Sequence, residues 1–170
     1  MSIEIRKTTH DDVDAIMPIF DIARKTIATL GIDQWQDGYP TTELIHSDVD
    51  NGISYVVLNN GTIIGTFVLL FDGEPDYNVI YDGRWKTNGS YITVHRITVT
   101  PSERGGKTTA GIFTYIQELA KQSGMGAIRI DTHRGNLPMR KCLDKNGFVH
   151  CGSIYLRADG KHRVAYEKVL

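Results

Sequence analysis

Two runs rich in β-forming residues, 54–58 and 62–71, are separated by the dipeptide Asn60-Gly61. This dipeptide is among the strongest local signals for a tight hairpin, because both turn residues must accept positive φ angles. The hairpin predicts an antiparallel pair of strands in the first half of the chain. Any fold proposed for the sequence has to contain it.

Further strands and helices alternate around this hairpin, separated by glycine, proline and Asp-Gly signals. Strands are predicted at 3–7, 91–100, 127–131, 148–156 and 162–169. Helices are predicted from about 13 to 27, where Pro18 should kink or bound the pattern, and at 41–49, 104–123 and 136–147. A mixed sheet with helices on both faces, in an α/β or α+β fold, accounts for this order. Residues 72–90 have no clear periodicity, and a loop of that length is more often functional than decorative.

The overall composition sets limits on what the chain does. Its 170 residues are 41% hydrophobic, enough for a single domain spanning 1–170. The formal net charge of −1 argues against binding to the backbone of nucleic acid. No apolar run approaches the ~20 residues of a membrane-spanning helix, and the first residues lack an export signal, so a cytoplasmic protein is expected. The two cysteines, Cys142 and Cys151, have no metal-ligand spacing, and no metal is predicted.

Residues 97–109, ITVTPSERGGKTT, read as a strand, a basic glycine-containing turn and the start of a helix. Backbone N–H groups at a helix start lack partners within the helix, and the helix dipole adds positive charge there. Gly105 and Gly106 allow a ligand to approach the backbone, and Arg104 and Lys107 add formal charge. The segment is therefore suited to a phosphate-bearing ligand, although an ordinary helix start with solvated basic residues would look the same.

One known phosphate loop fits this segment only in part. Gly106-Lys107-Thr108 supplies the second half of the nucleotide-binding pattern G-x-x-x-x-G-K-[ST]. The first glycine of that pattern is replaced by Pro101, which has no N–H and a fixed φ. Asp131 at the end of a predicted strand could imitate a magnesium-binding aspartate or simply end the strand. A nucleotide-binding protein is therefore a less favoured alternative.

A second pattern matches over nearly the whole chain. Val99, Pro101 and Arg104-Gly105-Gly106 fit the strand and the first half of the motif [QR]-x-x-G-x-[GA], which joins a strand to a helix in the GNAT superfamily of N-acetyltransferases. The run from Asn136 to Lys145, Gly147 and Phe148 is similar to that family's second motif, N-x-x-A-x-x-x-Y-x-K-x-G-F. The sequence therefore resembles GNAT acetyltransferases. The resemblance implies a mostly antiparallel sheet of about seven strands, splayed between the fourth and fifth, with helices on both faces.

The resemblance also implies an acetyl-CoA site and direct attack of an amine on the thioester. Main-chain groups of Ile97 and Val99 would hold the acetyl carbonyl and the pantetheine arm. Asn136 would bind the pantetheine, and its helix, including Met139, would flank the thiol end. A backbone N–H on the carbonyl would polarise it and stabilise the developing oxyanion. The pyrophosphate would be held by the turn and the first residues of the helix: Arg104, Gly105, Gly106, Lys107, Thr108 and Thr109.

The sequence departs from the family pattern at the positions that move protons. Leu143 stands where a tyrosine often protonates the leaving thiolate, and Thr93 stands where some members have a glutamate base. His95 is the first candidate base, because alternation along the strand would place it on the face of Ile97 and Val99. His133 is the second. Either histidine could instead be structural, Tyr155 and Tyr91 are weaker candidate acids, and ordered water could relay the proton.

Lys107 and Thr109 also replace smaller residues of the motif, so their side chains could crowd the pyrophosphate or, for Lys107, add a useful charge. These departures leave a non-catalytic acetyl-CoA or CoA-binding module as a rival to the enzyme.

The resemblance further implies that the acceptor amine, a small molecule or a protein, meets the loops 32–40 and 72–90. Trp35 and Tyr39 in the first loop are the candidate acceptor-binding residues, because acidic and aromatic groups together can hold an amine cation. The loop aromatics could equally pack in the core or form a homodimer contact.

Overall fold

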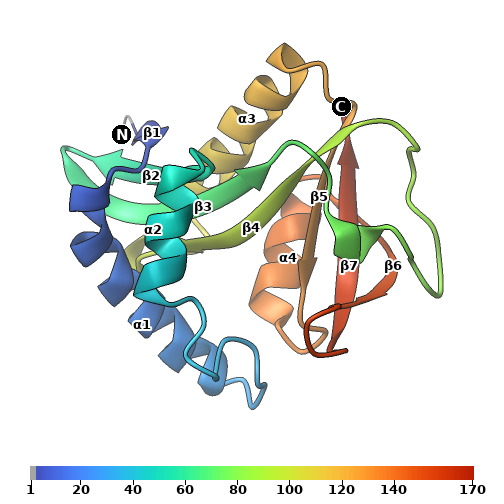
Figure 1. Ribbon diagram of the computed structural model, residues 1–170, viewed down its shortest axis with the longest axis horizontal. Coiled ribbons are helices and arrows are strands. Elements are labelled where there is room, and N and C mark those ends of the chain that lie inside the picture. Colours follow the sequence, from blue (N-terminus) through green and yellow to red (C-terminus); the bar gives the residue numbers. More distant parts are fainter. Residues whose placement is uncertain (1–2) are drawn as a thin grey trace. The chain divides into compact units, whose positions relative to one another are not determined.

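A computed structural model describes residues 3–170, which form seven strands and four α-helices (Figure 1). The strands form one mostly antiparallel sheet in the order β1-β2-β3-β4-β5-β7-β6, in which β4 and β5 are parallel. This confirms the predicted mixed α/β fold. The strands are β1 (Ile3–Lys7), β2 (Ser54–Asn59), β3 (Thr62–Leu70), β4 (Tyr91–Val99), β5 (Ala127–Thr132), β6 (Val149–Tyr155) and β7 (His162–Val169), and the helices are α1 (Val13–Ala28), α2 (Thr42–Asp50), α3 (Lys107–Gln122) and α4 (Leu137–Lys145).

Three 3₁₀ turns complete the structure: η1 (His10–Asp12), η2 (Pro75–Tyr77) and η3 (Pro101–Glu103). Two predicted boundaries need correction. Helix α1 runs on through Pro18, so this proline is not a boundary. Helix α3 begins at Lys107 and not at Arg104, because η3 and a left-handed Gly105, with φ of 67°, come first.

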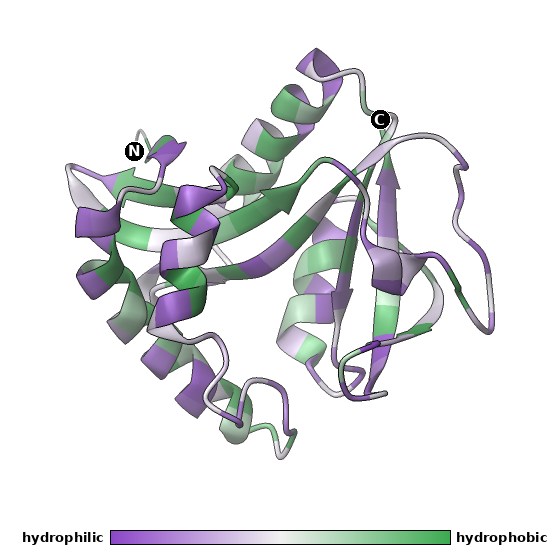
Figure 2. Cartoon of the chain, in the orientation of Figure 1, coloured by the Kyte–Doolittle hydropathy of each residue, from purple (hydrophilic) through white to green (hydrophobic). Residues whose placement is uncertain are grey.

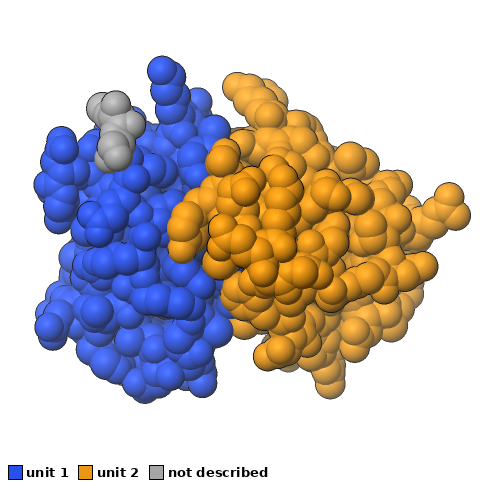
Figure 3. All heavy atoms as spheres, turned by 90° about the horizontal axis from the view of Figure 1, so that it is seen from above, with its two compact units in different colours: residues 1–69, 95–112 blue, residues 70–94, 113–170 orange. Residues whose placement is uncertain are grey.

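The chain divides into two compact units, coloured in Figure 3. Unit 1 comprises residues 1–69 and 95–112, and unit 2 comprises residues 70–94 and 113–170. The first half of β4 thus belongs to unit 2 and its second half to unit 1, whereas α3 begins in unit 1 and continues in unit 2 from Phe113. Each unit has its own buried apolar cluster.

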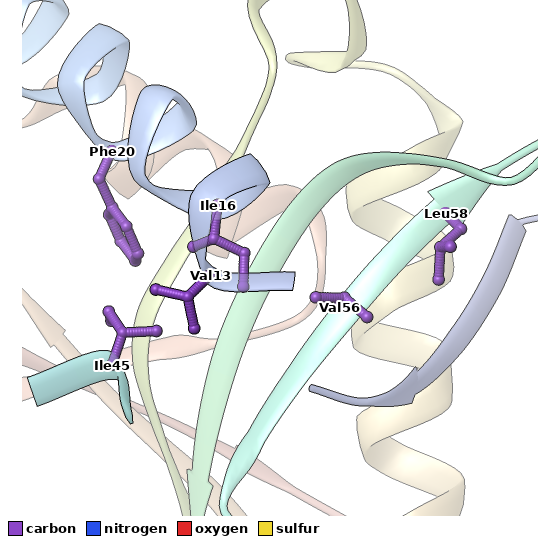
Figure 4. Packing of buried hydrophobic residues seen from close by; sticks show 6 residues of the cluster. All are labelled: Val13, Ile16, Phe20, Ile45, Val56 and Leu58. Carbon is purple, nitrogen blue, oxygen red and sulfur yellow. The ribbon is translucent and has the colours of Figure 1, made fainter. Parts of the chain in front are cut away.

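The core of unit 1 lies between α1, α2 and the face of β2 that they cover. Side chains from these three elements converge in Figure 4, and each is at most 7% exposed: Val13, Ile16, Phe20, Ile45, Val56 and Leu58. Helix α1 can contribute three side chains to this core because its apolar residues recur at helical spacing, which gives the helix one hydrophobic face (Figure 2). Thr41 is the N-cap of helix α2, and its side-chain oxygen accepts a hydrogen bond from the Leu44 N–H at 3.2 Å.

The start of α3 covers the opposite face of the same part of the sheet. Val56 faces the α1–α2 core and pairs with Arg6, so Ile5 and Ile3 of β1 point the other way. A Cβ built on Gly111 of α3 would lie 2.8 Å from Ile3, which shows how closely the helix approaches there. The prediction of helices on both faces is therefore confirmed within unit 1. The predicted hairpin is also present, with φ of 49° at Asn60 and 78° at Gly61.

In unit 2, β7 pairs with β5 on one side and with β6 on the other, all antiparallel. The parallel pairing of β4 with β5 joins Tyr91–Thr93 to Ala127–Arg129. Phe113 of α3 and Phe148, just after α4, meet edge to face at 5.0 Å, and Leu143 of α4 is fully buried.

In unit 2, the face of the sheet that carries Arg129 and Glu167 is covered by the segment 72–90 and not by a helix. Glu167 of β7 and Arg129 of β5 are directly paired, so their side chains share this face. Glu167 is 1% exposed and accepts hydrogen bonds from the Lys86 N–H at 2.5 Å, the Thr87 N–H at 3.2 Å and the Thr87 hydroxyl at 2.8 Å. The Arg129 guanidinium donates to the same carboxylate at 2.8 Å and stacks between the rings of Trp85 and Tyr91. The segment is thus anchored by a buried ion pair.

The middle of the segment pairs with β6 through its backbone. Tyr81 and Ser153 exchange two N–H···O hydrogen bonds of 2.8 Å, and the Arg84 N–H donates to the Cys151 carbonyl at 2.9 Å. Gly83 is required here, because a Cβ at this position would lie 1.9 Å from the Cys151 oxygen. The long loop is therefore a fixed part of unit 2. No helix within residues 3–170 has the length and apolar character needed to cross a membrane.

Candidate functional site

The turn before α3 has the open backbone that a phosphate-binding role requires. Gly105, Gly106 and Lys107 are exposed, and a Cβ built on Gly105 would meet no atom within 4 Å. At Gly106 the nearest atom would be the Glu103 carbonyl oxygen, at 3.6 Å. A ligand can therefore reach the main chain of both glycines, at the positive end of a 16-residue helix.

The side chains around this turn differ in their surroundings. Arg104 is exposed, and its Nη1 donates to the hydroxyl of Thr26 on α1 at 2.9 Å. Thr108 and Thr109 are 5% and 9% exposed, and the Thr108 hydroxyl donates to the Glu103 carboxylate. Of the two residues that replace smaller ones in the motif, Thr109 is thus buried in the protein and Lys107 is exposed to solvent.

The second half of β4 carries Ile97 and Val99 and packs closely on β3. A Cβ on Gly65 of β3 would lie 2.9 Å from both the Thr98 carbonyl oxygen and a Val99 methyl group. The Thr100 N–H donates to the Ile64 carbonyl at 2.8 Å. The backbone of Ile97 to Val99 is therefore held in place where the strand approaches the phosphate turn.

Strand β4 continues through Arg96, but this residue has a left-handed φ of 50°. Regular alternation of faces holds only along an unbroken extended chain. Alternation along β4 therefore does not establish that His95 shares a face of the sheet with Ile97 and Val99. His95 itself is half-buried.

The side chain of Arg96 forms a cluster that the sequence analysis did not single out. Its Nη2 donates to both carboxylate oxygens of Asp48, at 2.8 and 2.7 Å, and its Nη1 donates to the Tyr39 hydroxyl at 2.6 Å. Burial raises the pKa of Asp48, and the adjacent Arg96 charge and hydrogen bonds partly offset that effect. The sequence does contain one sign of this ion pair. Asp48 follows Ile45 by three residues, which places it on the buried side of the helix, where a carboxylate needs a partner.

The loop 32–40 contains the two candidate acceptor-binding residues. Trp35 has φ of 63° and packs edge to face on Phe20 of the unit 1 core, at 5.7 Å. The rings of Trp35 and Tyr39 are 6.4 Å apart. Trp35 therefore contributes to packing, and Tyr39 joins the loop to strand β4 through Arg96.

The remaining predicted residues lie in unit 2, at the start of α4. Asn136 is the N-cap of this helix, and its side-chain oxygen accepts from the Met139 N–H at 3.3 Å. His133 Nδ1 accepts from the Gly135 N–H at 3.0 Å, and the His133 carbonyl accepts from the Asn136 N–H at 2.9 Å. His133 thus helps to shape the turn that begins the helix, which agrees with the structural role considered for it.

Other positions discussed for proton transfer have mainly structural surroundings. Leu143, at the position of the family's tyrosine, is fully buried in the core. Thr93 is also fully buried, and its hydroxyl has no hydrogen-bond partner among the described residues. The Tyr91 hydroxyl accepts from the Glu74 N–H at 3.1 Å, and Tyr155 is about half exposed against Tyr81.

Most aromatic residues of the segment 72–90 also pack inside unit 2. Tyr77 is 2% exposed, its hydroxyl donates to Asp131 at 2.6 Å, and its carbonyl accepts from the Trp85 indole N–H at 3.0 Å. Within residues 3–170, no three or more His, Cys, Asp or Glu side chains are grouped in a way that suits a metal ion.

Comparisons with known proteins show the family and agree with the fold. The family model of the GNAT acetyltransferases matches residues 18–148. A GNAT family acetyltransferase from Streptococcus agalactiae is 34% identical, with a TM-score of 0.86, and the match covers 99% of this chain and 95% of that one. A search of curated proteins finds no match.

Two more distant structures share the fold. An N-acetyltransferase from Thermoplasma acidophilum, in complex with coenzyme A, is 20% identical with a TM-score of 0.70 over the whole of both chains. A ribosomal-protein-alanine N-acetyltransferase from Brucella melitensis is 19% identical with a TM-score of 0.69, and the match covers 98% of this chain and 99% of that one. From the family match and the Streptococcus structure together, this chain belongs to the GNAT family of acetyltransferases.

Proposed function

We propose that the whole chain forms one acetyltransferase domain that transfers the acetyl group of acetyl-CoA to a primary amine. The observation that carries the proposal is the open Gly105-Gly106 backbone at the start of α3, directly after strand β4, in a chain of the GNAT family. The coenzyme A bound to the Thermoplasma relative supports the choice of donor. Family membership also removes the reason to read Gly106-Lys107-Thr108 as a nucleotide-binding loop.

In this proposal the chain's residues bind the donor in two places. The main chain of Gly105 to Thr109 binds the pyrophosphate, with Arg104 and Lys107 as exposed charges beside it. Ile97 and Val99 hold the acetyl carbonyl and the pantetheine arm through their backbone, and Asn136 and Met139 at the start of α4 contact the arm. The buried positions of Thr108 and Thr109 support this assignment, because their side chains do not lie in solvent above the turn.

The amine nitrogen attacks the thioester carbonyl carbon and a C–N bond forms. The C–S bond then breaks with release of CoA as thiolate, which takes up the proton that the nitrogen loses as the amide forms. A direct attack is favoured over transfer through a cysteine, because burial raises the pKa of both Cys142 and Cys151 and so disfavours the reactive thiolate. Both thiols are free, which suits a reducing compartment such as the cytoplasm.

The attacking ammonium must first lose a proton, and His95 is the proposed base. It lies beside the irregular residue of β4, and its counterpart His133 is already engaged in the turn before α4. His95→Ala is expected to lower kcat and to remove the acidic limb of the pH profile, with partial rescue by added imidazole. An unchanged profile would exclude His95 and leave His133 or a water relay.

The first test is thermal unfolding with acetyl-CoA, with CoA, and with ATP plus magnesium. A ligand at a hundred times its Kd adds about 2.7 kcal/mol and should raise Tm by several degrees. Stabilisation by acetyl-CoA and CoA but not by ATP is expected. A shift with ATP alone would contradict the proposed donor.

Two variants locate the binding site. Arg104→Ala together with Lys107→Ala should weaken acetyl-CoA binding, whereas Lys121→Ala removes an exposed charge from the last turn of the same helix and should not. If the double variant and Lys121→Ala weakened acetyl-CoA binding equally, only the overall charge of the protein would matter.

Turnover is then measured by release of the CoA thiol with a panel of small amines and peptides. Activity with one class of amine identifies the acceptor. Binding of acetyl-CoA without turnover on the whole panel would favour the non-catalytic module. That alternative is specific, because Leu143 and Thr93, at the positions of the family's tyrosine and glutamate, are fully buried.

A further inference from the structure

Arg96 has a backbone conformation that its residue type does not favour. A non-glycine residue with φ of 50° is uncommon, and it costs on the order of 1 kcal/mol or more unless its surroundings hold it in place. Arg96 lies within β4, one residue before Ile97, whose backbone is proposed to bind the acetyl carbonyl. Whatever holds Arg96 therefore also sets the backbone at the proposed reaction centre.

The Arg96 side chain is held by two partners from different elements. Asp48 of α2 binds it with both carboxylate oxygens, and the two side chains are only 5% and 11% exposed. Tyr39 of the loop 32–40 adds a 2.6 Å hydrogen bond, and its ring centre lies 5.8 Å from the guanidinium carbon. A buried pair of this kind is costly to break, because the remaining charge loses its partner.

The guanidinium is consequently fixed at both of its terminal nitrogens. The Arg96 Nε is also buried, and it has no hydrogen-bond partner among the described residues. The position of the side chain therefore depends on Asp48 and Tyr39.

We infer that Asp48 and Tyr39 are positioning residues for acetyl transfer. They hold Arg96 in its left-handed conformation and thereby orient the backbone of Ile97 to Val99 toward the thioester carbonyl. Tyr39 also belongs to the loop proposed to meet the acceptor, so the same hydrogen bond links the acceptor loop to the strand that binds the donor. This inference rests on the proposed function, since it assigns a role within that reaction.

The mildest test is Tyr39→Phe, which removes one hydroxyl and keeps the ring. If the inference is correct, kcat falls about tenfold, because small misplacements of reacting groups are costly. The Kd for CoA should change much less than kcat, because the pyrophosphate is proposed to bind at residues 104–109 and not at Ile97 to Val99, and Tm should fall by only a few degrees. Tyr81→Phe is the matched control, because Tyr81 is half exposed and its hydroxyl makes no hydrogen bond among the described residues.

A double-mutant cycle separates positioning from a general loss of stability. Arg96→Lys keeps a positive charge for Asp48 but cannot bind Asp48 and Tyr39 in the same way. If Tyr39 acts through Arg96, Tyr39→Phe should lower kcat in the native background and have little further effect in Arg96→Lys. Independent, multiplying losses in kcat would overturn the inference, as would a kcat of Tyr39→Phe equal to that of the control.

A measurement without turnover keeps this inference separate from the proposed function. The ¹⁵N–¹H signal of the Ile97 amide should shift in Tyr39→Phe and stay in place in Tyr81→Phe. An unmoved Ile97 signal would overturn the inference whatever the activity. A protein without any transfer activity would overturn the proposed function, and with it the catalytic role assigned to Asp48 and Tyr39, even if the signal moves.

Discussion

The carboxylate of Asp12 should make the stability of this protein depend on pH in a defined range. Its two oxygens accept hydrogen bonds from the Arg6 guanidinium, at 2.7 and 2.9 Å, and from the Thr9 N–H and hydroxyl, at 2.7 and 2.9 Å. The side chain is 10% exposed. These donors, the Arg6 hydrogen bonds above all, lower the pKa of Asp12 from 3.8 to about 2. The charged form is thus favoured in the folded protein.

A carboxylate with a lowered folded pKa stabilises the fold above its unfolded pKa and loses this effect as pH falls through the folded pKa. The difference between 3.8 and about 2 corresponds to roughly 2.4 kcal/mol at neutral pH. Because the Arg6 side chain is 37% exposed and partly screened by water, about 2 kcal/mol is the expected contribution. Linkage leaves about half of it at pH 3 and almost none below pH 2.

The assay is urea unfolding of the native protein and of Asp12→Asn at pH 7, 5, 4 and 3. The free energy of unfolding should differ by about 2 kcal/mol at pH 7 and 5, and the difference should shrink toward about 1 kcal/mol at pH 3. Asp14→Asn is the control, because Asp14 is exposed and has no ion pair among the described residues. A difference that stays constant from pH 7 to 3 would refute the reasoning, because the effect would then not depend on the carboxylate charge.

Three further changes test other parts of the structure. Glu167→Gln leaves Arg129 buried without its counter-charge and should cost about 3 kcal/mol, with faster hydrogen exchange at the Lys86 amide. Gly83→Ala should lower Tm by many degrees, since its Cβ would overlap the Cys151 oxygen, whereas Gly89→Ala, with open space at its Cβ, should change the unfolding free energy by no more than about 0.5 kcal/mol. Thr41→Ala removes the N-cap of α2 and should cost about 1 kcal/mol in urea unfolding; no change would mean that water replaces the cap.

The elements that local rules govern could be predicted from the sequence. The Asn60-Gly61 turn demands positive φ angles, and it has them. Apolar spacing located α1, and Asn136 and Thr41 begin their helices as capping residues should. The boundary of α3 was wrong by three residues, because helix propensity does not distinguish a 3₁₀ turn and a left-handed glycine from the first turn of an α-helix.

Features that depend on contacts between distant residues could not be predicted. The sequence shows that the segment 72–90 is long and irregular, but not that Glu167, some eighty residues away, binds its backbone. Arg96 looked like an ordinary residue of an extended strand. Only the positions of Asp48 and Tyr39 explain how it maintains a left-handed conformation there. The exposed glycine turn before α3 was predictable, because Gly105 and Gly106 are consecutive residues at a helix start.

The backbone pairing of Tyr81 to Arg84 with β6 also affects how this chain meets its own copies. A sheet edge with unpaired N–H and C=O groups is a template for strand exchange and aggregation. Here the chain covers part of its β6 edge with its own loop, and Gly83 and Gly152 permit the close approach. Damage to this covering, as in Gly83→Ala, should therefore appear first as concentration-dependent association at moderate temperature, before the protein loses its helices.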